Sequence, residues 1–138
     1  MKKIFIILIL MGFLLGKEGI KLEKGEYVIS FYSVVYKIEG NKIDLGENGE
    51  LILEKSINEM ISLNKEFLKD TNSNPIPLNK VEYPALFVIH AVVKDKGIPE
   101  EISEIAKYVK KVVGLEYIGG KEKAEEYIRY WEEIHKER

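Results

Sequence analysis

Apolar and aromatic residues gather first in a stretch that is typical of a β-strand. Residues 26–38 (EYVISFYSVVYKI) are rich in Tyr, Val, Ile and Phe, which favour strands over helices. Gly40-Asn41 follows, and both residues tolerate the positive φ angles of a two-residue hairpin turn. This turn sets Ile38 opposite Ile43, with oppositely charged residues against each other on either side of that pair. The pattern therefore predicts an antiparallel hairpin.

A second turn extends the predicted hairpin to three strands. Residues 47–49 (ENG), taken as a three-residue loop with its glycine in the left-handed region, pair Leu45 with Leu51. This register keeps one face of the sheet apolar. We therefore predict a three-stranded antiparallel meander over residues 26–54, with helices covering its apolar face.

The first covering helix is expected directly after the meander. Ser56 and Glu59 fit a capping box in which the serine is the N-cap, and an apolar stripe with helical spacing follows. We expect this helix to end near Asp70. Residues 71–78 (TNSNPIPL) combine proline, asparagine and serine, a composition that predicts a loop.

Three further helices are predicted in the second half of the chain. Residues 79–97 carry suitable caps at both ends and fit a buried helix, although the apolar run over 85–93 also fits a fourth strand. Residues 99–113 begin with proline, with glutamates near the start and lysines near the end, as the helix dipole favours. Residues 121–136 have an apolar stripe and form the final predicted helix. The expected fold class is α+β, a meander followed by about four helices packed on one face.

The first residues of the chain have the pattern of an export signal. Two lysines precede an apolar run over residues 4–15, whereas a bilayer-spanning helix needs about 20 apolar residues. Gly16 suits a cleavage site, but Leu14 does not complete the usual small-residue pattern. We interpret residues 1–18 as a signal peptide or N-terminal membrane anchor and 22–138 as a single small α+β domain. The alternative is that the apolar run belongs to the fold.

Composition narrows the function classes. The 138 residues include 21 basic and 23 acidic side chains, a net charge of −2 that gives no electrostatic basis for binding nucleic acid. The chain has no cysteine, which excludes disulfides, thiolate zinc sites and a cysteine nucleophile. The charged residues are mostly lysine and glutamate, and glutamine is absent. This composition is typical of a thermophile, and a genome of low GC content produces the same bias.

Metal or acid–base chemistry depends on the only two histidines, His90 and His135. His90 lies within an apolar run, where most histidines are hydrogen-bonded core residues. Glu132 and His135 are three positions apart on the last predicted helix, a spacing that helical bundles use to bind metal. Ser30 and Ser33 interrupt the first strand, but no G-x-S-x-G motif is present.

Aromatic residues provide the remaining binding candidates. Tyr130 and Trp131 are adjacent on the last predicted helix, and Tyr130 falls outside its apolar stripe. Exposed Tyr and Trp side chains often anchor ligands. We therefore expect a non-catalytic, extracytoplasmic module, secreted or membrane-anchored, that touches the membrane only through its first segment. It would bind a protein, peptide or small ligand in the cell envelope without a cofactor. The alternative is a small enzyme or metal-binding protein that uses His90 or the Glu132/His135 pair.

Overall fold

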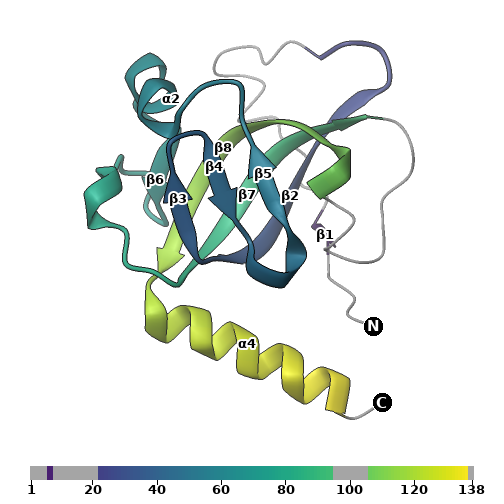
Figure 1. Cartoon of the computed structure of the whole chain (residues 1–138), viewed down its shortest axis with the longest axis vertical. Coiled ribbons are helices and arrows are strands. Elements are labelled where there is room, and N and C mark those ends of the chain that lie inside the picture. Colours follow the sequence, from purple (N-terminus) through teal and green to yellow (C-terminus); the bar gives the residue numbers. More distant parts are fainter. Residues whose placement is uncertain (1–5, 8–21, 95–105, 137–138) are drawn as a thin grey trace.

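A larger and a smaller β-sheet make up most of the computed structural model, which describes residues 6–7, 22–94 and 106–136 (Figure 1). The larger sheet has the strand order β1-β2-β7-β8-β6, and it is antiparallel except for the parallel pair of β6 and β8. Its strands are β1 (Ile6–Ile7), β2 (Glu26–Val35), β6 (Leu68–Asp70), β7 (Ala85–Lys94) and β8 (Val109–Gly119).

The smaller sheet has the order β3-β4-β5 and lies in front of the larger one in Figure 1. Its strands are β3 (Lys37–Glu39), β4 (Lys42–Asp44) and β5 (Glu50–Ile52). The helical segments are η1 (Gly46–Asn48), α2 (Ile57–Leu63), η2 (Leu78–Lys80) and α4 (Lys121–Lys136), and residues 106–108 are also helical. None of the helices within the described ranges is long and apolar enough to cross a bilayer.

β2 and β7 form the centre of the larger sheet. Each contributes ten residues, paired without interruption from Glu26 opposite Lys94 onward. Phe31 and Phe87 are fully buried in the main core, together with apolar residues of the smaller sheet. Because both faces of these strands are covered, their sequences are continuous apolar runs with little alternation.

The predicted hairpin around Gly40-Asn41 is confirmed, and Ile38 lies opposite Ile43. However, residues 26–38 do not form one strand. The chain leaves the larger sheet at Tyr36, so that β2 and β3 belong to different sheets. The three-stranded meander therefore begins at β3, and its apolar face packs against the larger sheet instead of against helices.

The second turn of the meander also differs from the predicted one. Leu51 lies opposite Ile43 and not opposite Leu45, because the three-residue loop is Gly46–Asn48. The leading glycine of this loop has a φ angle of +69°, and its N–H donates to Asp44 Oδ1 at 2.7 Å. Since a slip by an even number of residues leaves every side chain on its original face, the predicted apolar face is retained.

The helix after the meander is shorter than predicted. Ser56 is confirmed as its N-cap, because Ser56 Oγ accepts a hydrogen bond from the N–H of Glu59 at 3.1 Å. However, α2 ends at Leu63 and not near Asp70, because Asn64 takes an extended backbone conformation. Leu68, which the predicted helix included, instead begins β6 (Leu68–Asp70) of the larger sheet.

The helix predicted over residues 79–97 is wrong, and the alternative strand over 85–93 corresponds to β7. The sequence fits both because a buried central strand lacks the alternation that identifies a half-exposed one. The helix predicted over residues 99–113 is wrong at its end, since Val109–Val113 belong to β8. Residues 99–105 lie outside the described residues.

The final predicted helix, residues 121–136, is confirmed as α4. Ala124 of α4 is fully buried against Val34 and Leu86, on the side of the larger sheet opposite to Phe31 and Phe87. The expected arrangement, four helices on one face of the meander, is therefore wrong. A sheet covers one face of the larger sheet and α4 covers part of the other.

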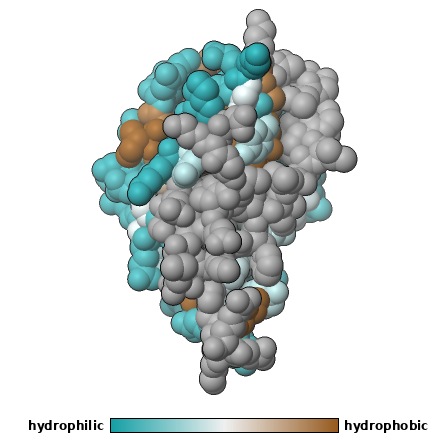
Figure 2. All heavy atoms as spheres, turned by 90° about the vertical axis from the view of Figure 1, so that its right-hand side faces the viewer, coloured by the Kyte–Doolittle hydropathy of each residue, from teal (hydrophilic) through white to brown (hydrophobic). Residues whose placement is uncertain are grey.

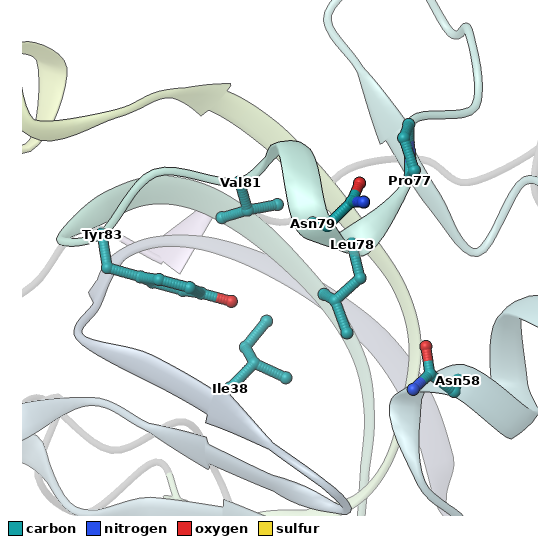
Figure 3. Close-up of a pocket in the computed structure, with 7 residues that line it drawn as sticks. All are labelled: Ile38, Asn58, Pro77, Leu78, Asn79, Val81 and Tyr83. Atoms are coloured by element: carbon teal, nitrogen blue, oxygen red, sulfur yellow. The ribbon is translucent and has the colours of Figure 1, made fainter.

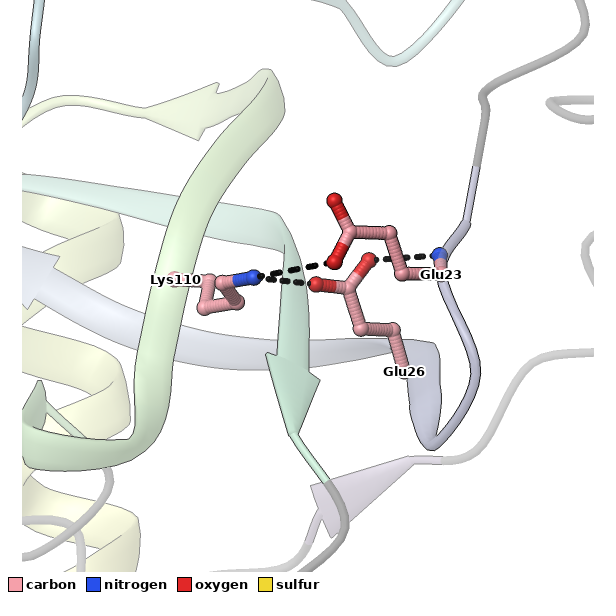
Figure 4. A network of polar contacts seen from close by, with 3 residues as sticks. All are labelled: Glu23, Glu26 and Lys110. Atoms are coloured by element: carbon pink, nitrogen blue, oxygen red, sulfur yellow. Dashed lines mark hydrogen bonds and ion pairs between the residues drawn. The ribbon is translucent and has the colours of Figure 1, made fainter.

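A polar contact joins the start of β2 to β8 (Figure 4). Lys110 Nζ lies 2.5 Å from Glu26 Oε2 and 4.0 Å from Glu23 Oε1, and the N–H of Glu23 donates to Glu26 Oε1 at 2.9 Å. The hydrogen bond from Lys110 lowers the pKa of Glu26, and the same bond raises the pKa of Lys110. This ion pair fixes one corner of the larger sheet.

The predicted signal or anchor, residues 1–18, lies outside the described residues except for β1. The backbone of β1 pairs antiparallel with β2, with Ile7 opposite Ser30. Figure 2 shows the side of the molecule on the right of Figure 1, where the coloured surface carries small hydrophobic patches next to hydrophilic atoms.

Candidate functional site

An open groove lies between the smaller sheet, α2 and the segment before β7 (Figure 3). Its volume is about 530 Å³, within the range of roughly 300–1,000 Å³ that is usual for ligand pockets. The lining residues come from three elements that are far apart in the sequence: Ile38, Asn58, Pro77, Leu78, Asn79, Val81 and Tyr83.

Backbone hydrogen bonds hold the segment before β7 in place. The N–H of Ile76 donates to the carbonyl of Leu68 at 3.2 Å, which ties the predicted loop over residues 71–78 to β6. The η2 turn then presents its side chains to the groove, and the N–H of Val81 donates to the carbonyl of Leu78 at 3.2 Å. Residues of this segment therefore line a groove on a fixed backbone.

Tyr83 closes one end of the groove. Figure 3 shows its ring extending toward Ile38 of β3, and a backbone hydrogen bond joins Ile38 to the phenol oxygen. Burial raises the pKa of Tyr83, and the hydrogen bond from Ile38 opposes that change. The phenol is therefore neutral at physiological pH.

The groove carries no charge on its lining residues. Five of the seven lining residues are apolar or aromatic, and the other two, Asn58 and Asn79, have amide side chains. Each amide offers two N–H donors and one carbonyl acceptor. Figure 3 shows Tyr83, Val81 and Ile38 together at one end, Asn79 beside Leu78, and Asn58 apart from them on α2. The groove thus combines apolar side chains with uncharged hydrogen-bonding groups.

His90 lies elsewhere, in the middle of β7. Its side chain is 3% exposed, and its Nδ1 is 2.6 Å from Ser30 Oγ on β2. Its Nε2 is 3.6 Å from Glu116 Oε1 on β8, beyond hydrogen-bond distance, and has no partner. Lys69 of β6 is buried and pairs in register with Glu116. We call these four residues, Ser30, His90, Glu116 and Lys69, the His90 cluster.

The His90 cluster contains a Ser-His-Glu row, a set of residue types that is found in hydrolases. Burial lowers the pKa of His90, and the nearby carboxylate of Glu116 opposes that change. A nucleophile has to reach its substrate, however, and Ser30 is 0% exposed in the middle of β2. The row is therefore a set of polar groups on three strands, of which Ser30 and His90 are buried and hydrogen-bonded to each other and Glu116 is partly exposed.

The remaining predicted site residues lie on α4. Tyr130 is 56% exposed, as its position off the apolar stripe suggested, whereas Trp131 is half-buried between ring contacts with Tyr127 and Tyr130. Glu132 is exposed, and the side chain of His135 lies outside the described residues. The described part of the chain contains no group of three or more His, Asp or Glu side chains placed to hold a metal ion.

The sequence pointed to His90 and Ser30 separately, but it predicted neither their contact nor the groove. The asparagines of the groove, Asn58 and Asn79, follow a helix cap and a proline-rich loop and carry no motif. Glu116 is one of many glutamates in the sequence, and only the pairing of β7 with β8 brings it to His90.

The described residues thus form an α+β fold of two packed sheets, with an uncharged groove between the smaller sheet, α2 and the segment before β7. No family model, no curated protein and no solved structure matches the chain.

Proposed function

We propose that this protein is a non-catalytic binding module whose groove takes an uncharged, extended peptide segment. The observation that carries the proposal is the composition of the groove, which pairs an apolar end with two amide side chains and has no charged lining residue. Pockets of this kind hold a ligand by apolar burial and set its orientation by a few polar groups.

A peptide has groups that match both kinds of lining residue, the apolar ones and the amides. An apolar side chain of the peptide would contact Ile38, Val81 and Tyr83, which lie together in Figure 3. The peptide backbone would exchange hydrogen bonds with Asn58 and Asn79, since an amide side chain both donates to a carbonyl and accepts from an N–H. A charged ligand would lose its hydration in this groove without meeting an opposite charge.

The proposal includes a location outside the cytoplasm, which rests on residues 1–18 of the sequence. The partner would then be a protein or peptide of the cell envelope. The pairing of β1 with β2 fits the alternative, in which part of the apolar run belongs to the fold, because residues paired in this sheet cannot lie in a membrane at the same time. N-terminal sequencing of the native protein tests the signal peptide, because only a cleaved chain lacks this first segment.

Replacing Leu78 in the groove by glutamate is expected to weaken peptide binding strongly. Peptides selected from a random display library on the wild-type chain are the probes, made with blocked termini. We expect the Leu78→Glu variant to bind them about tenfold more weakly or worse, a loss typical of a central contact residue.

The matched control is Leu63→Glu, which adds the same charge at a leucine on α2 that is 67% exposed and lies outside the groove lining. This variant is expected to bind the peptides as the wild type does, and circular dichroism checks that both variants fold. Selected peptides with a charged consensus, or equal binding by Leu78→Glu and the wild type, would refute the proposal.

A further inference from the structure

The His90 cluster has one residue on each of four strands of the larger sheet. Ser30 belongs to β2, His90 to β7, Glu116 to β8 and Lys69 to β6. His90 lies opposite Gly114 of β8, next to an irregularity in the pairing of β7 with β8. Such irregularities re-aim side chains, and they are frequent near functional positions. A polar side chain here is costly unless its hydrogen bonds are made, because the site is buried.

The hydrogen bonds of the His90 cluster suit a neutral imidazole. We assign the hydroxyl of Ser30 as donor to Nδ1 of His90, which puts the ring hydrogen on Nε2, facing Glu116. A second proton would have to bind at Nδ1. Ser30 Oγ would then accept from Nδ1–H, and its own hydrogen would need a new acceptor inside the sheet.

The charges that face His90 come from two of the neighbouring strands. The carboxylate of Glu116 on β8 favours a protonated imidazole, and the ammonium of Lys69 on β6 disfavours it. The facing residue of β2, Ser30, is uncharged. Burial is the largest influence and lowers the pKa of His90, so the neutral form prevails in the folded chain at neutral pH.

We propose that the His90 cluster is an acid-sensitive latch: a neutral His90, hydrogen-bonded to Ser30, holds β2 and β7 together, and acid loosens the larger sheet by favouring states in which this imidazole is protonated. The stabilisation is complete above the ordinary pKa of histidine, about 6.5. It is lost as the pH falls from there through the lower pKa of the folded form, because the unfolded chain takes up the proton first.

The unfolding equilibrium measured against pH tests the latch on the full chain. Urea unfolding at pH 7.5, 6.5, 5.5 and 5.0 compares the wild type with His90→Gln, which keeps a polar side chain that does not titrate. Below pH 6.5 the folding equilibrium constant of the wild type is expected to fall by up to about tenfold per pH unit more than that of His90→Gln. The matched control, His135→Gln, alters the other histidine and is expected to keep the wild-type slope.

Two further measurements keep the test decisive if His90→Gln fails to fold. An NMR titration of the wild-type imidazole signals is expected to place the His90 midpoint below about 6.5. Glu116→Gln removes the opposing carboxylate and is expected to move that midpoint lower still. A midpoint at or above 6.5, or equal slopes for the wild type and His90→Gln, would overturn the proposal.

Discussion

Truncating Phe87 to alanine is expected to lower the free energy of unfolding by about 3–5 kcal/mol, the usual cost of removing a buried phenylalanine. Phe87 is the third residue of β7 and is 0% exposed. Its ring centroid is 5.6 Å from that of Tyr117 on β8. It also belongs to the core shared with the smaller sheet, so its loss weakens the contact between strands and the contact between sheets.

Urea unfolding of Phe87→Ala at pH 7.5, followed by circular dichroism, measures this loss. Tyr130→Ala is the matched control, because it removes an aromatic ring that is largely exposed on α4. Surface substitutions of this kind change stability by about 0.5 kcal/mol at most. Similar losses for the two variants would contradict the position of β7 at the centre of the core.

Replacing Ser30 by alanine is expected to cost about 1–3 kcal/mol, the penalty for leaving a buried polar atom without its partner. The hydroxyl of Ser30 is 2.6 Å from Nδ1 of His90, whose other ring nitrogen already has no partner. The variant therefore leaves the imidazole with neither hydrogen bond in a buried site.

Ser33→Ala provides the control for Ser30→Ala within the same strand. Ser33 is also buried in β2, but its hydroxyl contacts only the carbonyl of Val34, at 3.3 Å. We expect a clearly smaller loss for Ser33→Ala. The double variant Ser30→Ala/His90→Leu should recover much of the Ser30→Ala loss, because removing both polar partners leaves none unpaired. Equal losses for the two serine variants would argue against the cluster.

Features that depend on neighbouring residues were predictable from the sequence. The turn at Gly40-Asn41 fixed the register of Ile38 with Ile43, and Ser56 capped a helix as its spacing from Glu59 suggested. The final helix follows two glycines and has an apolar stripe of its own, so it was also predicted. Each of these depends on contacts within a few residues of the chain.

Features that depend on distant partners were not predictable. The strand over residues 26–38 gave no sign of splitting at Tyr36, because β2 owes its place to pairing with β7, more than 50 residues away. The apolar residues near Leu68 fit a helical stripe in the sequence. In the structure, Leu68 pairs in parallel with Leu115 of β8. Central strands are buried on both faces, so their sequences lack the alternation that would have identified them.

The candidate site could not be predicted from the sequence for the same reason. Ile38, Asn58 and Tyr83 line one groove because β3, α2 and the segment before β7 meet, and none of these residues belongs to a motif. His90 stood out as a polar residue in an apolar run, and its burial fits the interpretation as a hydrogen-bonded core residue. The composition of a groove, unlike a catalytic motif, appears only when the chain is folded.

The most direct test of the proposed binding function is an NMR map of where a peptide binds. Amide spectra of the full chain are recorded during titration with a neutral peptide from the display selection. We expect the largest shifts at the amides of Ile38 and Asn58 and over residues 78–83. Largest shifts around Tyr130 and Trp131 on α4, with the groove amides unmoved, would contradict the groove as the binding site.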